Sequence, residues 1–293
     1  MPQDPVVETR AGTRSSAPSR EDASARKEQR LRTMLSAMDS AIVAFSGGVD
    51  SAYLSYVATM ELGQRAVCVT ADSASYSARH RELAERTAAD LSLCHEIIRT
   101  EEMTRPEYRA NGADRCFHCK DELFTHLRQM ADARAIRYVL DGSNADDRGD
   151  YRPGREAARR LGVRSPLDEV DLSKAEIREL SRRAGLRVWD EPASACLSSR
   201  IPYHTEVTDE RLRMVEQAEA VLRGLGLRVC RVRHHESVAR LEVAPAEMER
   251  LMEPETRVAV ARELRRIGYR FVTLDLEGYR TGSLNEPLAL RPL

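Results

Sequence analysis

The six-residue string SGGVDS at positions 46–51 has the residue types of an anion-binding turn. It follows an apolar run at 41–45 and precedes a helical pattern. Glycines at such a point allow a sharp turn and close backbone approach, so backbone amides and the helix N-terminus face outward as a cradle for phosphate. The string is neither the G-x-G-x-x-G fingerprint nor the G-x-x-x-x-G-K-[ST] loop, whose lysine is absent. A plain turn in which Asp50 and Ser51 only cap the helix is the alternative.

Polar residues end two further apolar runs of the sequence. The strings are TADS at 70–73 and DGSN at 141–144. The carboxyl ends of parallel strands lie at one edge of an open sheet, where doubly wound folds bind nucleotides. We therefore predict that Asp72, Ser73 and Asn144 complete a nucleotide site beside the glycine turn. Ordinary loops are the alternative.

Three cysteines have positions that suit a metal or a cluster. Cys116 and Cys119 form a C-x-x-C, and Cys196 lies in the string PASACLSSR at 192–200. Three thiolates leave one iron of a [4Fe-4S] cluster open to an extra sulfide. A zinc site with an unidentified further ligand, a redox pair and inert thiols are the alternatives. The remaining cysteines fall in strand patterns and are predicted as core residues.

Alternating strand and helix patterns position these residues. Four short, mostly apolar runs occupy 41–45, 66–70, 94–98 and 138–140. Helical spacing occurs between and after them, at 52–62, 78–91, 120–133 and 174–184. Nearly all-apolar runs are typical of strands that helices cover on both faces. We therefore predict an α/β fold with a doubly wound parallel sheet.

The pattern changes after residue 200. A helix is predicted at 209–223, then strands at 228–233 and 239–243, a helix at 256–267 and a strand at 270–274. This order indicates a smaller C-terminal α+β domain. With the boundary between 192 and 202, we predict a disordered tail at 1–30, a nucleotide-binding domain at 31–195 and the α+β domain at 196–293. The tail prediction rests on its scarcity of apolar residues.

Composition narrows the possible partners of the chain. The net charge of -1 and the 5% aromatic content argue against a basic nucleic-acid interface. No apolar run approaches the ~18 residues that cross a bilayer, and no basic stretch with an apolar one behind it opens the sequence as a secretory signal. We expect a cytoplasmic protein without nucleic-acid or membrane partners, whose cysteines are thiols or metal ligands.

Several motifs together resemble one family. SGGVDS by itself is similar to the pyrophosphate loop of the PP-loop ATP pyrophosphatases. RCFHCK at 115–120, DGSNADDRGDYRPG at 141–154, EPASACLSSRIPY at 191–203 and GYRTGSLN at 278–285 follow it in order. The set resembles the LarE family of ATP-dependent sulfur transferases, which help to make the nickel-pincer nucleotide cofactor of lactate racemase. The resemblance extends over about residues 40–285.

The resemblance implies an adenylation followed by a sulfur transfer. ATP would activate a carboxylate of pyridinium-3,5-biscarboxylic acid mononucleotide and release pyrophosphate, and a sulfur nucleophile would displace AMP to leave a thiocarboxylate. The residues implied for the pyrophosphate are Ser46, Gly47, Gly48 and Ser51, with Asp50 placing Mg²⁺. A homo-oligomer, a hexamer in relatives, is also implied.

The family has two sulfur sources, and the cysteines bear on the choice. In one form the residue matching Cys196 gives up its own sulfur and becomes dehydroalanine. In the other, three cysteines hold a [4Fe-4S] cluster that delivers sulfide from an external donor. Because Cys116 and Cys119 are both present, we favour the cluster form with Cys196 as catalytic residue and third ligand; the sacrificial form is the alternative.

An anionic substrate calls for planar cationic side chains. Arg231 and Arg233 alternate onto one face of a predicted strand, Arg280 lies in the 278–285 turn, and Arg200 lies beside Cys196. The resemblance assigns this zone to the substrate carboxylate or phosphate; solvated surface charge is the alternative. Competing functions are a PP-loop tRNA thiolase, an ammonia-using amidating ligase, and a nucleotide sensor that leaves ATP intact.

Overall fold

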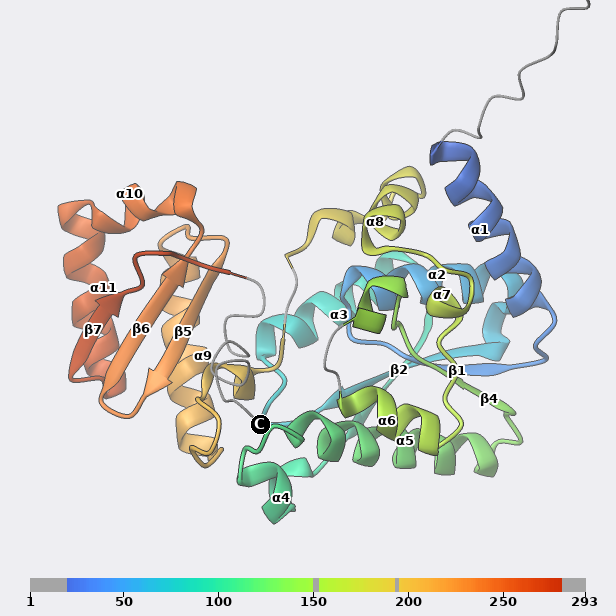
Figure 1. Ribbon diagram of the computed structural model, residues 1–293, viewed down its shortest axis with the longest axis horizontal. Coiled ribbons are helices and arrows are strands. Elements are labelled where there is room, and N and C mark those ends of the chain that lie inside the picture. The colour runs from blue at the N-terminus through green and yellow to red at the C-terminus, as the bar shows by residue number, and fades with distance from the viewer. Residues whose placement is uncertain (1–19, 150–152, 193–194, 281–293) are drawn as a thin grey trace, which may run out of the picture.

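Short apolar strands form the centre of the larger lobe. The computed structural model describes residues 20–149, 153–192 and 195–280 (Figure 1). The strands β1 (Ala41–Ala44), β2 (Ala66–Asp72), β3 (Cys94–Arg99) and β4 (Tyr138–Leu140) are all parallel and lie in the order β3-β2-β1-β4. The winding direction reverses between β1 and β4, which is the switch point of a doubly wound sheet. The predicted α/β class and all four strands are confirmed.

Helices cover both faces of this sheet. Ile42 of β1 packs in one apolar cluster with α5 (Arg115–Ala133) and α6 (Pro153–Arg160). Its neighbours Ala41 and Val43 pack in another with α2 (Val49–Leu62) and α8 (Lys174–Arg183). Side chains of a strand alternate between faces, so a strand covered on both sides must be apolar at every position. Figure 1 shows the two layers, with α5 and α6 on the opposite side of the sheet from α2 and α8.

The remaining elements of the larger lobe are shorter or peripheral. They are α3 (Ala78–Asp90), α4 (Pro106–Arg109), α7 (Pro166–Glu169) and the 3-10 turns η1 (Gly63–Arg65), η2 (Glu102–Thr104), η3 (Ala145–Gly149) and η4 (Arg187–Asp190). The predicted helices at 52–62 and 120–133 begin earlier in the structure, at Val49 and Arg115. The C-x-x-C therefore lies in the first turns of α5 rather than in the loop before it.

The predicted disordered tail is wrong over its last eleven residues, because helix α1 (Arg20–Ser36) begins at Arg20. Leu31 and Leu35 lie one turn apart on this helix and are completely buried in the core shared with α2. Ion pairs of 2.9 Å join Lys27 to Glu176 and Arg32 to Glu61. A polar helix of this kind is stabilised by tertiary contacts rather than by its own composition. Residues 1–19 lie outside the described part of the chain.

The C-terminal lobe is a mixed three-stranded sheet backed by helices. Its elements are η5 (Leu197–Arg200), α9 (Asp209–Gly224), β5 (Cys230–His235), β6 (Val238–Val243), η6 (Pro245–Glu247), α10 (Met248–Met252), α11 (Pro254–Ile267) and β7 (Phe271–Leu274). β6 pairs antiparallel with β5 and parallel with β7. The sheet and its helices share a core of their own, and Figure 1 shows them as a separate lobe. The predicted helix, strand, strand, helix, strand order is confirmed, with α10 as an unpredicted addition.

A small apolar cluster joins the two lobes. Tyr108 of α4 packs with Leu197 and Ile201 of the connecting segment and with Leu212 and Val215 of α9. Since these side chains are nearly or fully buried, the connection near Cys196 is a packed junction and not a free linker. No helix in the described residues is both long and apolar enough to cross a bilayer.

The packing of α1 predicts that a substitution of Leu31 strongly destabilises the protein. We expect Leu31→Ala to lower the free energy of unfolding by about 3 kcal/mol, because it leaves a cavity in the core against α2. Urea denaturation measures the change. The exposed neighbour Thr33 provides the control, and Thr33→Ala should shift the free energy of unfolding by less than about 0.5 kcal/mol. Equal effects at the two positions would mean that α1 does not pack on the core.

Candidate active site

The glycine turn joins β1 to α2 at the switch point of the sheet. Gly47 has φ +71°, and a Cβ there would lie 2.8 Å from the Cα of Ala84 on α3, so conformation and space both require glycine. Gly48 is the residue before α2, and no side chain caps the helix there. No side chain therefore occupies the start of α2 as a cap, and anion binding by its first amides stays a prediction.

Two serines hold the turn in shape. The Ser51 hydroxyl donates to the Gly48 carbonyl at 3.0 Å, accepts from the Ser46 amide at 3.2 Å and lies 3.1 Å from the Ser46 hydroxyl. The loop after β4 packs directly on the start of α2, where a Cβ at Gly142 would lie 3.0 Å from the Ser51 amide nitrogen. Loops from β1 and β4 therefore meet at the switch point, which is where a doubly wound sheet binds its nucleotide.

Asp50 has one satisfied and one unsatisfied carboxylate oxygen. Oδ2 forms a short ion pair with Lys174 at the start of α8. Oδ1 is buried and has no hydrogen-bond partner within the described residues. Burial raises the pKa of Asp50, and Lys174 opposes the shift. A buried, unpartnered carboxylate oxygen fits a hard cation, because Mg²⁺ takes oxygen ligands. Lys174 was not predicted as a partner of Asp50, because its only signal in the sequence is that it is one of three lysines.

The other predicted nucleotide-binding residues occupy the carboxyl edge of the sheet but already have protein partners. Asp72 at the end of β2 pairs with Arg81 of α3 at 2.5 Å. The Ser73 hydroxyl lies 3.1 Å from that of Ser75. The Asn144 side chain accepts from the Asp146 amide at 3.0 Å and orders the loop after β4. Contact with nucleotide stays a prediction for all three.

The Cys196 segment is fixed to the larger lobe by hydrogen bonds from both sides. The amide of Leu197 donates to the carbonyl of Ser75, just after β2, at 2.9 Å. The Ser198 hydroxyl lies 2.6 Å from that of Tyr108, and Arg115 donates to the Ser198 carbonyl at 2.9 Å. These bonds place the Cys196 backbone at the same sheet edge as the glycine turn.

The three predicted cysteine ligands share one electrostatic environment. Desolvation is the main cause that raises the pKa of Cys116 and of Cys119, and negative charge on Cys196 raises both further. Arg115 opposes the shift at Cys116. Cys116 is exposed as a whole residue although its thiol is desolvated, whereas Cys119 and Cys196 are partly buried. The three thiols are therefore close enough to influence one another's pKa, and their binding of a cluster stays a prediction.

A single metal ion has no ready site there. Within the described residues, no three His, Cys, Asp or Glu side chains gather closely enough to hold one ion. The choice between a zinc ion and a cluster therefore stays open. A [4Fe-4S] cluster binds each cysteine through a different iron atom and so requires thiols that are spread apart. Binding of a cluster by Cys116 and Cys119 of α5 together with Cys196 stays a prediction.

Arg200 holds the Cys196 segment instead of facing solvent. Its side chain is 1% exposed, and its Nε donates to the Glu219 carboxylate on α9 at 2.7 Å. Its Nη1 donates to the carbonyls of Ala195 and Cys196 at 2.7 and 2.9 Å. Burial alone would raise the pKa of Glu219, but the nearby guanidinium of Arg200 holds it below its ordinary value. Sequence reasoning placed Arg200 at the site but missed this positioning role.

The other predicted arginines lie in the C-terminal lobe and already have protein partners, and Arg231 and Arg233 are buried. Arg233 donates to Glu242 and to the Ser199 carbonyl at 2.7 and 2.8 Å. The Arg231 guanidinium lies over the Tyr279 ring, 5.0 Å from its centroid. Arg280 pairs with Glu277 at 2.6 Å. β5 does place Arg231 and Arg233 on one face, as predicted, and their contact with substrate stays a prediction.

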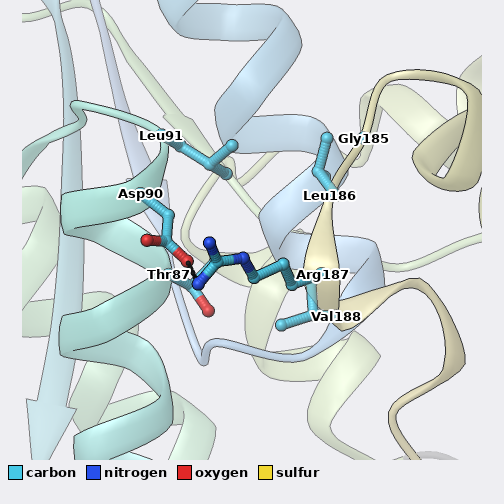
Figure 2. Close-up of a pocket in the computed structure, with 7 residues that line it drawn as sticks. All are labelled: Thr87, Asp90, Leu91, Gly185, Leu186, Arg187 and Val188. Atoms are coloured by element: carbon cyan, nitrogen blue, oxygen red, sulfur yellow. Dashed lines mark ion pairs between the residues drawn. The ribbon is translucent and has the colours of Figure 1, made fainter.

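A separate cavity of about 220 Å³ lies away from this site (Figure 2). It is lined by the end of α3 and the segment after α8, including Thr87, Asp90 and Arg187. Because α3 begins at the carboxyl edge of the sheet and runs back, its last turn lies at the opposite edge. The cavity is therefore not the predicted nucleotide site. Residues 281–285, the end of the GYRTGSLN motif, lie outside the described residues, as do 150–152 and 193–194.

The fold and the site define an α/β protein with a PP-loop-type glycine turn at the switch point of a doubly wound sheet. The chain is 43% identical over 262 residues to an uncharacterised protein of Synechocystis sp., covering 89% of this chain and 98% of that one. A Methanocaldococcus jannaschii protein is 26% identical over 240 residues, 82% of this chain and 90% of its own. No family model matches the chain.

A third relative has a named activity. The pyridinium-3,5-bisthiocarboxylic acid mononucleotide synthase of Lactiplantibacillus plantarum is 34% identical over 265 residues, which are 90% of this chain and 95% of the synthase. The chain therefore belongs to the LarE family, the family of that synthase.

The close approach at Gly47 predicts that a substitution there destabilises the protein much more than the same substitution at Gly48. We expect Gly47→Ala to lower the free energy of unfolding by about 2–4 kcal/mol, because it adds left-handed strain and a clash with the α3 backbone. Gly48 has φ -75°, and its Cβ would lie 3.6 Å from the nearest atom, so Gly48→Ala should lower it by less than about 1 kcal/mol. Chemical denaturation of both variants tests the turn geometry.

The stability of the protein should fall in mild acid because of His80. Burial, with help from Arg79, Arg200 and Arg231, lowers the pKa of His80 from 6.5 to about 4. Between these values the unfolded chain binds a proton that the folded chain does not, so stability falls as pH falls through this window. From about pH 7.5 to pH 5, His80 should account for a loss of about 2 kcal/mol.

Urea denaturation at the two pH values measures that loss. In His80→Gln, the free energy of unfolding should fall by about 2 kcal/mol less between pH 7.5 and pH 5 than in the wild type. In His126→Gln, at an exposed position, the fall should equal that of the wild type. An unaltered pH dependence in His80→Gln would contradict the assignment.

Proposed function

We propose that the chain is an ATP-dependent sulfur transferase that converts a carboxylate of pyridinium-3,5-biscarboxylic acid mononucleotide to a thiocarboxylate, for nickel-pincer cofactor synthesis. One observation carries the proposal: the 2.9 Å bond from the Leu197 amide to the Ser75 carbonyl puts Cys196 at the sheet edge that holds the glycine turn. An activated carboxyl group bound at that edge would lie between an anion cradle and a thiol. The relative of L. plantarum, named for a bisthiocarboxylic acid mononucleotide, supports the choice of substrate.

The glycine turn suits the first half-reaction. The substrate carboxylate attacks the α-phosphorus of ATP, the bond to the β-phosphate oxygen breaks, and pyrophosphate leaves with the electron pair. The open amides of α2 and the two serine hydroxyls stabilise the leaving pyrophosphate. Asp50 would hold Mg²⁺ through its unpartnered Oδ1. The metal ion, when bound, neutralises phosphate charge during the transfer.

Sulfur transfer is the second half-reaction. A sulfur nucleophile adds to the acyl carbon of the adenylate, and AMP departs with the electron pair of the carbon–oxygen bond. We assign the sulfur to sulfide supplied by a donor and carried by a [4Fe-4S] cluster, which Cys116, Cys119 and Cys196 would hold. Arg115, which is 2% exposed, lies where its charge favours the thiolate form of Cys116. The basic residues of the second sheet would bind the substrate carboxylate and phosphate.

Replacing Cys196 should separate the two half-reactions. In Cys196→Ala we expect thiocarboxylate formation to fall at least about 100-fold, because the sulfur-bearing or cluster-holding thiol is lost. Pyrophosphate release with the pyridinium substrate should persist, since the glycine turn is untouched. Mass spectrometry of the product and a pyrophosphate assay measure the two steps. Cys94→Ala is the matched control, because Cys94 lies in β3 away from the site.

Anaerobic purification, followed by iron, sulfide and mass measurements, distinguishes the two sulfur sources. Iron and labile sulfide in the wild type, absent from Cys116→Ala, support the cluster. A polypeptide lighter by one H₂S after turnover supports sacrifice of the Cys196 sulfur instead. Sulfur incorporation that continues in Cys196→Ala contradicts both routes, and failure to release pyrophosphate contradicts the proposed adenylation.

A further inference from the structure

Two consecutive residues after β2 contact both halves of the candidate site. The Tyr76 hydroxyl lies 3.0 Å from the carbonyl oxygen of Ser46, the first residue of the glycine turn. The carbonyl of Ser75, one peptide bond away, accepts the amide of Leu197, the residue after Cys196. The segment between β2 and α3 therefore connects the predicted pyrophosphate site to the predicted sulfur site.

On the nucleotide side, the contact is a hydrogen bond that can move. The single hydroxyl proton of Tyr76 has two acceptors at 3.0 Å, the carbonyls of Ser46 and of His80. Only one of them can receive a full hydrogen bond at a time. The Ser46 carbonyl belongs to the peptide that links Ser46 to Gly47, at the start of the turn that would hold the nucleotide. A ligand that shifts this peptide shifts the partner of Tyr76.

On the sulfur side, further hydrogen bonds hold the segment. The Ser75 side chain is buried and donates to the carboxylate of Glu102 at 2.7 Å, and Glu102 itself is 1% exposed. The next residue along the chain from Tyr76, Ser77, caps α3, and the Ala78 amide donates to Glu216 of α9 at 2.7 Å. Motion of residues 75–78 would therefore displace the Cys196 segment and the C-terminal lobe, because both are hydrogen-bonded to these residues.

We propose that Tyr76 is a positioning residue that couples occupancy of the glycine turn to the placement of Cys196. Nucleotide in the turn moves the Ser46 carbonyl, Tyr76 transmits the change to Ser75, and the bond to Leu197 sets Cys196 for attack. This coupling would keep the Cys196 sulfur out of its attacking position until nucleotide is bound. The sulfur would then react with the adenylate and not with molecules from the solvent. This inference rests on the proposed function, because it assumes that ATP binds at the turn.

Hydrogen exchange tests the coupling without any turnover. The probe is α,β-methylene-ATP, which cannot be split between the α and β phosphates, and its binding is first measured by calorimetry. In the wild type, exchange in the peptide that contains Leu197 should slow at least about threefold when the analogue binds. In Tyr76→Phe the analogue should still bind, but exchange at Leu197 should not respond. Tyr56→Phe, on the mid-part of α2, is the matched control and should behave as the wild type.

The two half-reactions provide the second readout. In Tyr76→Phe, AMP formation should stay within about threefold of the wild type, whereas thiocarboxylate formed per AMP should fall about 10- to 100-fold, because a misplaced sulfur loses the adenylate to water. Hydrolysis returns the carboxylate and AMP, so the loss appears as uncoupled ATP use. A merely structural tyrosine would lower both half-reactions alike, and that result overturns the inference.

The failures of the two proposals are distinguishable. If the analogue binds the wild type and exchange at Leu197 does not change, the coupling is wrong and the proposed function stands. If the analogue does not bind, the proposed function fails and the coupling fails with it.

Discussion

The ion pair between Arg200 and Glu219 is the interaction on which the site depends. Both side chains are almost completely buried, at 1% and 2% exposed, so each charge requires the other. Removal of one partner from such a pair costs about 3–5 kcal/mol, because the remaining charge stays buried without compensation. Arg200 uses its other donors on the carbonyls of Ala195 and Cys196. The pair therefore fixes the Cys196 segment and joins it to α9 at the same time.

One face of α9 docks the C-terminal lobe on the larger one. Glu216 and Glu219 lie three residues apart and so project from the same side of the helix. Glu216 accepts the Ala78 amide at the start of α3, and Glu219 accepts Arg200. Because both acceptors lie on one rigid helix, the lobe that carries Arg231 and Arg233 has a fixed relation to the end of β2. The predicted substrate clamps are thus placed by the same helix that places Cys196.

Local signals made the fold predictable, and long-range pairing made part of the site unpredictable. The strands could be found because a strand buried on both faces must be apolar throughout, and the turn because Gly47 sits where no other residue fits. Helix α1 could not, because its stability comes from the tertiary packing of Leu31 and Leu35 and not from a local signal. The partner of Asp50 is 124 residues away, and nothing near Lys174 in the sequence indicates it. The residue type of Arg200 indicated that it binds an anion, but not which anion. A guanidinium binds a substrate anion and a buried glutamate equally well.

Topology explains why the glycine turn, the loop after β4 and the start of α5 share one edge of the sheet. It also explains why Cys196 requires other contacts to reach that edge. In a parallel sheet the loops after β1 and β4 emerge on the same side, so the glycine turn and Gly142 meet by necessity. Helix α5 starts on that side as well, because it must run back to reach the start of β4, and this places Cys116 and Cys119 there. Cys196 follows no strand of that sheet. Bonds from its neighbours to Ser75, Tyr108 and Arg115, together with those from Arg200, bring it to the edge. The position of this sulfur is therefore the most sensitive feature of the site to changes elsewhere in the chain.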